Sequence, residues 1–253
     1  AESCTALKMA IGMLLIVAPL QLVVGDLSGK EVGQVQPAKL AAIEGFWETK
    51  TEQAFHIAAW PDRSIESNRW EISIPKIGSF ITAGSTEAEV QGLKDFAPED
   101  RPPVAVVFWA FRIMVGLGLA MIALGAWGAF LWWRRAPERS RLFLSACVAM
   151  GPAGFVAVIS GWVVAEVGRQ PYVIYGVLRT ADAVSPTPAG SVSASLLAFM
   201  VTYAIVFGVG ALYILRLMGE GPVAGSHEPP PEEPRMPGSA LAAAPEDPRP
   251  EKG

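Results

Sequence analysis

The stretch SGWVVAEVGRQPYVIYG, residues 160–176, ends a long apolar run with a glutamate, an arginine and a glutamine. A carboxylate at the edge of a bilayer costs about 2–4 kcal/mol unless a partner or a cofactor compensates it. Glu166 therefore has two interpretations. It is either a functional side chain with a partner, or a solvated residue that has already left the hydrocarbon.

The composition indicates a membrane protein. Of the 253 residues, 51% are hydrophobic and only 17% are charged, and the apolar residues are clustered in long runs. Such clustering is typical of transmembrane segments and excludes an ordinary soluble domain. The formal net charge of −4 is small, so nucleic acid is not an expected partner. Cys4 and Cys147 lie far apart in or beside apolar runs, which favours neither a zinc site nor a disulfide framework.

Four apolar runs are long enough to cross a bilayer as helices. They are residues 7–24, 104–133, 142–165 and 192–218. We therefore expect an all-α membrane protein with four transmembrane helices and a large extracytoplasmic loop, as part of a larger helical bundle. The expected domains are a first transmembrane helix (1–24), an extracytoplasmic loop (25–103), a three-helix transmembrane region (104–218) and a disordered, proline-rich cytoplasmic tail (219–253).

Basic residues in the link between the second and third runs set the expected orientation. The link contains Arg134, Arg135, Arg139 and Arg141. Short loops rich in arginine stay in the cytoplasm, so both ends of the chain are expected on that side as well. The loops 25–103 and 167–191 are then expected outside.

The large loop is expected to have secondary structure of its own. QPAKLAAIEGFWE, residues 36–48, predicts a short helix, because Pro37 suits a first turn and Leu40 and Ile43 are spaced for one face. RWEISIP, residues 69–75, alternates with a period of two and predicts a strand.

Several chemically distinctive side chains are predicted at one depth, beneath the large loop. A hydrocarbon core takes about 20 helical residues, so counting back from the end of the second span places Arg112 at the outer boundary and Met114 just beneath it. Counting forward along the third span places Trp162 near that boundary and Glu166 about one turn beyond, with Arg169 on the same face. Thioether and carboxylate groups can bind haem iron, and guanidinium groups can bind haem propionates. Taken singly, however, methionine in a span more often packs and interfacial arginine more often snorkels to headgroups.

Three motifs resemble one family of membrane enzymes. GWVVAEVGRQPY, residues 161–172, resembles the GWxxxExGRQPW signature of subunit I of cytochrome bd-type quinol oxidases. FWAFRIMVGLG, residues 108–118, resembles that family's methionine-bearing helix, and GDLSGKEVGQVQPAKLAAIEGFWET, residues 25–49, resembles the start of its quinol-binding loop. The resemblance implies a terminal oxidase in the bacterial cell (inner) membrane that takes electrons from quinol and reduces oxygen to water. It also implies two haems b, one haem d and oxidase subunit II as a partner.

The resemblance implies roles for individual residues. Met114 would be an axial ligand of the low-spin haem b iron, and Glu166 the ligand of the high-spin haem b iron near haem d. Trp162 would lie between haems and take part in electron transfer, and Arg112 and Arg169 would lie near propionates.

The quinol-site pair of the family corresponds to Lys39 and Glu44. Quinol oxidation needs a carboxylate that accepts protons as electrons leave. The two residues are five apart on a helix, so a quinol headgroup would meet them separately or through a distorted turn. Replacing either residue by alanine is expected to lower quinol turnover and to leave the haem spectra intact.

The sequence also departs from the family pattern. Tyr172 stands where the signature usually has tryptophan, and the outer loop is compact, as in the short-loop branch of the family, sometimes described as cyanide-insensitive. The histidine ligands of the family belong to its N-terminal half, whereas His56 and His227 lie outside every predicted span. Because the sequence also opens without methionine, we expect the C-terminal half of a longer subunit, inactive without the other half.

Two other interpretations stay open. One is a transporter-type membrane protein in which Glu166 and Arg169 bind an ion or a substrate. The other is a non-catalytic fragment, which is compatible with the oxidase interpretation. Haem spectra after co-expression with the missing half would separate the oxidase from the transporter, because a transporter would bind no haem.

Overall fold

The computed structural model describes residues 2–134, 140–184 and 186–220. The chain divides into two units, Ala1–Ser185 and Pro186–Gly253, and each is described by itself. The predicted tail, residues 219–253, lies almost wholly outside the described residues, as do Arg135 and Arg139 of the arginine-rich link.

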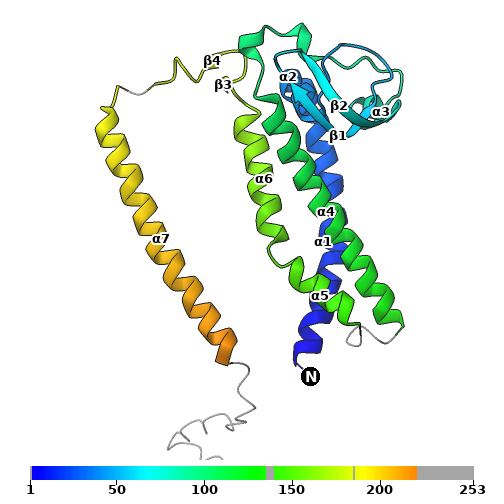
Figure 1. Cartoon of the computed structure of the whole chain (residues 1–253), viewed down its shortest axis with the longest axis vertical. Coiled ribbons are helices and arrows are strands. Elements are labelled where there is room, and N and C mark those ends of the chain that lie inside the picture. Colours follow the sequence, from blue (N-terminus) through cyan, green and yellow to red (C-terminus); the bar gives the residue numbers. More distant parts are fainter. Residues whose placement is uncertain (1, 135–139, 185, 221–253) are drawn as a thin grey trace, which may run out of the picture. The chain divides into compact units, whose positions relative to one another are not determined.

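Four apolar helices form the membrane-like part of the first unit (Figure 1). They are α1 (Glu2–Val35), α4 (Val104–Trp133), α5 (Arg141–Ala149) and α6 (Ala153–Val167). In the second unit, α7 (Ala189–Glu220) is a single helix with a row of aromatic rings at Phe199, Tyr203 and Phe207.

The prediction of four spans is confirmed. Four stretches are long and apolar enough to cross a membrane, and they are Cys4–Val35, Pro98–Trp133, Arg141–Val167 and Ala189–Gly219. At most 11% of the apolar window of any stretch is buried within the protein, so most of this surface needs lipid or another protein around it.

Two of the spans differ from their predicted form. Helix α1 continues to Val35, beyond the predicted end at residue 24, and an ion pair of 2.6 Å between Lys30 and Asp26 lies along this extension. The third span is not one helix, because a turn at residues 150–152 separates α5 from α6. Pro152 has no backbone N–H and disfavours helical geometry in the residue before it, so the α5 helix ends there. The depth count along the third span assumed a continuous helix and was wrong in that respect.

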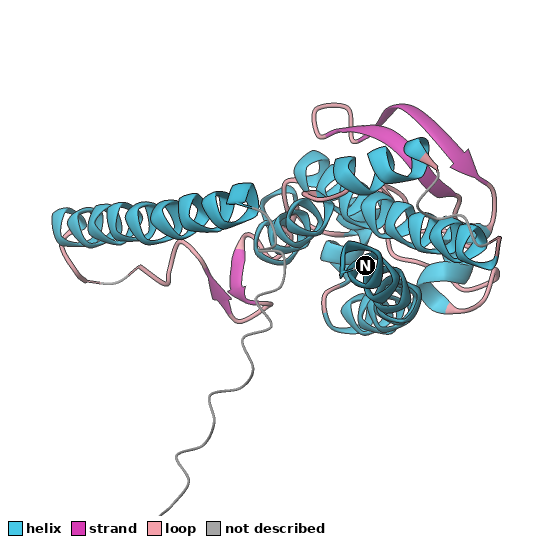
Figure 2. Ribbon diagram, turned by 90° about the horizontal axis from the view of Figure 1, so that it is seen from below, coloured by secondary structure: helices cyan, strands magenta, loops and turns pink. Residues whose placement is uncertain are grey.

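The segment between α1 and α4 folds into short elements, as predicted. Its order is α2 (Pro37–Glu44), β1 (Phe55–Asp62), β2 (Ser67–Ile74), α3 (Ile77–Ala83), η1 (Leu93–Asp95) and η2 (Pro98–Asp100). Strands β1 and β2 form an antiparallel hairpin, and a second small hairpin, β3 (Tyr172–Ile174) with β4 (Leu178–Arg179), follows α6 (Figure 2). The expected strand at 69–75 is present, although its apolar side chains Trp70, Ile72 and Ile74 are exposed.

The buried core of the first unit surrounds α2. Apolar residues of α2, including Leu40, Ala41 and Ile43, pack with Val107 of α4 and Val164 of α6 in one cluster. The short helix is therefore enclosed by one end of each of two long helices, and its polar side chains are carried to these ends.

Candidate functional site

The ends of α2 are fixed by local sequence. Pro37 stands at the start of the helix, where its missing N–H costs nothing. Gly45 ends the helix with φ of 71°, and its N–H donates to the carbonyl of Ala41. A Cβ at Gly45 would lie 3.2 Å from the Phe108 ring, so both the backbone angle and the close packing favour glycine. The last helical residue before this turn is Glu44.

Glu44 forms a buried ion pair with Arg112 of α4. The Nη2 atom of Arg112 lies 2.8 Å from a carboxylate oxygen of Glu44, and the two side chains are 9% and 4% exposed. Arg112 also donates from Nε to the carbonyl oxygen of His56, at 2.8 Å, and its guanidinium lies over the rings of Phe55 and Phe108. Its Nη1 atom is buried and has no hydrogen-bond partner among the residues that the structure describes. One donor of this guanidinium is thus available for a further acceptor.

Lys39, on the other side of α2, approaches α6. Its Nζ donates to the carbonyl oxygen of Ala165 at 3.2 Å, and its stem passes Gly168, where a Cβ would lie 3.1 Å from the lysine Cε. Burial and the positive charge of Arg169 lower the pKa of Lys39, and the carboxylate of Glu166 partly opposes this. The structure therefore brings Lys39 near Glu166 and Arg169, whereas Glu44 contacts α4. The separation expected from the five-residue spacing is confirmed.

Met114 contacts α6 rather than α2. Its sulfur would lie 2.9 Å from a Cβ built on Gly161, so the thioether packs directly on the backbone of that glycine. Arg112 and Met114 accordingly point to different helices, as their two-residue spacing predicted. Met114 remains partly exposed.

Trp162 and Glu166 lie on an open face of α6. The side chain of Trp162 is 67% exposed, and Glu166, one turn later, is exposed as well. Arg169 does not extend this helical face, because α6 ends at Val167 and Gly168 follows as the cap. The prediction of a shared helical face was therefore wrong for Arg169, which lies in the turn after the helix.

His56 is a site residue that the sequence reasoning placed only in a loop. It lies on β1, is 7% exposed, and packs edge-to-face on Phe46 with ring centroids 5.8 Å apart. Its Nδ1 atom lies 3.4 Å from a carboxylate oxygen of Glu71 but has no hydrogen-bond partner within the described part of the chain. Burial lowers the pKa of His56, Glu71 opposes this, and Arg112 adds to the lowering. The local sequence around His56 did not predict that it is buried. Its burial depends on contacts with Phe46, just after α2, and with Arg112 of α4.

A polar cluster fastens the turn after α6 to the start of α4. The hydroxyl of Tyr172 donates to Asp100 at 2.8 Å, and Arg179 pairs with the same carboxylate oxygen at 2.6 Å. The guanidinium of Arg179 lies 5.7 Å from the centroid of the Tyr172 ring. These contacts place the segment that carries Arg169 against the segment that leads into α4.

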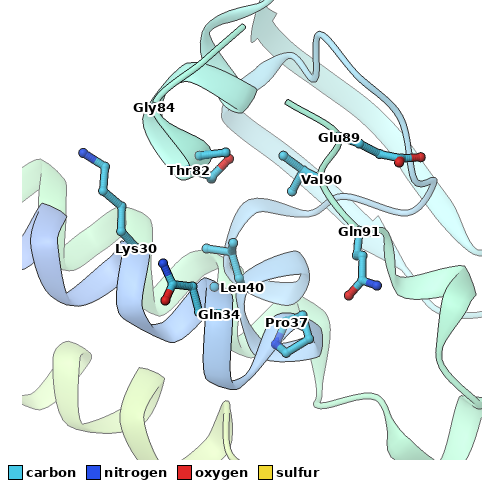
Figure 3. A pocket seen from close by; sticks show the side chains of 11 residues that line it. Lys30, Gln34, Pro37, Leu40, Thr82, Gly84, Glu89, Val90 and Gln91 are labelled. Atoms are coloured by element: carbon cyan, nitrogen blue, oxygen red, sulfur yellow. The ribbon is translucent and has the colours of Figure 1, made fainter. Parts of the chain in front are cut away.

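A cavity of about 500 Å³ lies on the α1 side of α2 (Figure 3). Its lining comes from the end of α1, the start of α2, the end of α3 and the strand-like segment before η1, and includes Lys30, Gln34, Leu40, Thr82 and Val90. Neither Lys39 nor Glu44 lines it, so the cavity is not formed by the buried ion pair.

Comparison with known proteins places the chain in a family. The family model described as "Cytochrome bd terminal oxidase subunit I" matches residues 2–222. The chain belongs to this family. The match covers both units and all four apolar stretches, and so confirms the resemblance of the three motifs.

Relatives of this bd oxidase subunit I chain are known in several bacteria. It is 34% identical to cytochrome bd ubiquinol oxidase subunit 1 of Bacillus subtilis, over 81% of this chain and 45% of the relative. It is 28% identical to cytochrome bd-II ubiquinol oxidase subunit 1 of Escherichia coli, over 90% of this chain and 57% of the relative. The structure of bd oxidase from Geobacillus thermodenitrificans matches with a TM-score of 0.69 and 28% identity, over 82% of this chain and 48% of that chain. The chain therefore spans about half the length of the curated relatives it matches.

The bd oxidase family uses haem, and the residues present fit that group. Within the described residues, no set of three or more His, Cys, Asp or Glu side chains could hold a metal ion. A haem iron needs only one or two protein ligands, because the porphyrin supplies the others. The thioether of Met114 and the exposed carboxylate of Glu166 have the chemistry to bind haem iron, and Nη1 of Arg112, without a hydrogen-bond partner in the described residues, could donate to a propionate.

Proposed function

We propose that the chain forms the part of a bd-type terminal oxidase that oxidises quinol at the outer face and holds haem for oxygen reduction. The observation that carries the proposal is the buried Glu44–Arg112 pair, which joins α2 to the helix of Met114. Burying two charges is costly, so a pair retained in this position favours a functional role. Family membership supports the oxidase class, and the names of the curated relatives support quinol as the electron donor.

Glu44 is the proposed proton acceptor for quinol. A carboxylate in hydrogen-bond reach of a quinol hydroxyl can take its proton as the electron leaves. Arg112 holds the carboxylate of Glu44 in place through Nη2 and is itself held by the carbonyl of His56. Lys39 is proposed to orient the headgroup from the α6 side, and its lowered pKa makes it a readier proton donor than a solvated lysine.

Haem would be held by residues of α4 and α6. Met114 is proposed as the axial ligand of a low-spin haem b and Glu166 as the ligand of a high-spin haem b, with Arg112 and Arg169 toward the propionates. These haems, together with haem d, supply the electron transfer and oxygen chemistry when bound. Trp162, exposed on the same face as Glu166, is proposed to fill the space between haems.

The haem ligands that this sequence lacks bear on how the oxidase is assembled. Methionine usually ligates low-spin haem opposite a histidine, and no histidine of this sequence lies in an apolar stretch. We infer that the other haem ligands come from outside residues 1–253, that subunit II is a partner, and that the chain alone is inactive. The loop 25–103 is proposed to face outward, with both ends of the chain in the cytoplasm, because of the arginine-rich link.

Quinol-driven oxygen uptake by the assembled oxidase that contains this chain tests the proposal. We expect haem b and haem d absorption bands and oxygen uptake that depends on quinol. As a control, Glu87→Gln changes an exposed carboxylate of the same loop and is expected to leave both unchanged. Absence of haem from the purified complex would contradict the proposal, as would stoichiometric haem binding and quinol-driven oxygen uptake by the 253-residue chain alone.

A further inference from the structure

The buried carboxylate of Glu44 and the exposed carboxylate of Glu71 both act electrostatically on one buried histidine, His56. Glu44 is 3% exposed, His56 is 7% exposed, and the side chain of Glu71 is 44% exposed. Both Glu44 and His56 contact Arg112, one through its carboxylate and the other through its backbone carbonyl. The imidazole Nδ1 atom then lies 3.4 Å from Glu71.

We propose that His56 is a proton-relay residue, which passes protons from Glu44 to Glu71 and so to the water outside. The inference rests on the proposed quinol oxidation, because that reaction delivers the protons to Glu44. A buried acceptor must return its proton before it can serve again, and it needs a titratable group between itself and solvent.

The surrounding hydrogen bonds hold the two ends of this path in position. Asn68 donates from Nδ2 to Glu71 at 2.9 Å and to the carbonyl of Gly45, the residue after Glu44, at 3.3 Å. The indole N–H of Trp47 donates to the Asn68 oxygen at 2.9 Å. Glu71 is thereby tied to the end of α2, although it belongs to β2. The Nδ1 atom of His56 is the part of this arrangement that has no hydrogen-bond partner in the described residues.

The charges around His56 suit a group that is neutral at rest. Burial lowers its pKa, and Arg112 and Lys50 disfavour the imidazolium, whereas Glu71 and Glu44 favour it. These charged groups belong to α2, α4, β2 and the loop before β1, and each acts electrostatically on the ring. Transfer to His56 leaves Glu44 ionised again. When the next quinol protonates Glu44, that carboxyl no longer favours the imidazolium, so the proton already on His56 has reason to move on to Glu71.

The relay is a proton transfer with no change in oxidation state. The O–H bond of protonated Glu44 breaks, and an N–H bond forms on the imidazole, directly or through one water. The proton on Nδ1 then leaves for the carboxylate of Glu71, which is exposed and exchanges it with water. A histidine can pass a proton this way because its two ring nitrogens are distinct sites.

The test uses the assembled oxidase with His56→Gln, Glu71→Gln and the double variant, with Glu52→Gln as a control at an exposed glutamate of the same loop. We measure quinol-driven oxygen uptake across pH, haem absorption, and oxygen uptake driven by a one-electron dye that carries no proton. His56→Gln is expected to lower quinol turnover by about 100-fold, with haem content and dye-driven uptake unchanged. Glu52→Gln is expected to match the unaltered oxidase.

The pH profile separates a relay from a merely structural role. His56 must be neutral to accept a proton, so turnover falls as pH drops through its pKa, and Glu71 raises that pKa. Glu71→Gln is therefore expected to shift the fall of quinol turnover at acid pH to lower pH. In a chain that already carries His56→Gln, it is expected to leave the pH profile unchanged.

Each other outcome contradicts a definite part of the inference. An unaltered oxidase without quinol-driven uptake overturns the proposed function, and the relay with it. An active oxidase whose turnover and profile are the same in His56→Gln overturns the relay alone. If His56→Gln loses haem, the test rests on Glu71→Gln, which alters an exposed side chain. A pH profile of quinol turnover that does not shift in that variant overturns the relay.

Discussion

The Glu44 side of α2 and the open face of α6 both carry proposed redox residues, but this chain surrounds them to very different extents. Glu44 is buried, its carboxylate has an arginine partner on α4, and that arginine also binds the β1 strand at the carbonyl of His56. Trp162 and Glu166 project from an apolar helix with no such enclosure by the described part of the chain. The difference teaches that the residues proposed for quinol are positioned within this chain, whereas those proposed for oxygen chemistry need other groups to complete their surroundings.

The largest effect is expected at the open face. In the assembled oxidase, Glu166→Ala should lower oxygen reduction by more than about 100-fold, since even the loss of a residue that merely supports a metal ligand costs about 10–100-fold. The physical reason is loss of the proposed iron ligand, whose charge the metal would compensate. Haem absorption and oxygen uptake measure it. Val158→Ala on the same helix, also exposed, serves as the control. Retained high-spin haem in Glu166→Ala would show that the open face is only a packing surface.

Met114 lies on α4, two residues after Arg112, and contacts α6 at Gly161, and its replacement should remove one spectral signal. Met114→Leu is expected to abolish the low-spin haem b band and to leave haem d. Leucine is close to methionine in volume, so the contact with Gly161 should cost less than about 1.5 kcal/mol. Optical spectra of the reduced oxidase measure the change. A low-spin band of unchanged position and intensity would rule out this ligand.

At the enclosed side, two substitutions of Glu44 should behave differently. Glu44→Gln keeps the acceptor for Arg112 and removes the proton acceptor, so quinol turnover should fall about 100-fold with haem spectra intact. Glu44→Ala leaves the Arg112 guanidinium buried without its partner, at a cost of about 3–5 kcal/mol. The alanine variant should therefore also disturb the helix of Met114, and intact haem spectra are no longer expected for it. Thermal unfolding and spectra, read together, distinguish the two; equal behaviour would mean that the ion pair does not hold the site.

Sequence patterns predicted the elements well and their contacts poorly. Apolar runs located all four spans, and the proline at residue 37 with the apolar spacing after it located α2. The break at Pro152 was missed because hydropathy records burial in lipid and not helix continuity. Glu44 and His56 both bond to Arg112 of α4, which lies 68 and 56 positions further along the chain. No local periodicity contains such pairings, since they depend on how α2 and the hairpin pack on α4.

The smallest effect is expected at Tyr172, which ties the turn that carries Arg169 to Asp100, just before α4. Tyr172→Phe removes the hydroxyl that donates to Asp100, but Arg179 still occupies that carboxylate and still faces the ring. The unfolding midpoint of the assembled oxidase should fall only slightly, on the order of 1–3 °C, and quinol turnover should stay within about twofold because no reacting group is altered. The hydrogen bond to Asp100 raises the pKa of Tyr172, so the folded state favours the protonated phenol. Its stabilising contribution is therefore present at neutral pH and is lost as the pH rises through the raised pKa. The midpoints of the oxidase and its variant should differ at pH 7 and converge under alkaline conditions. A large loss of haem or turnover in Tyr172→Phe would mean that this contact controls the placement of Arg169, and that the enclosed and open regions are more tightly coupled than their surroundings indicate.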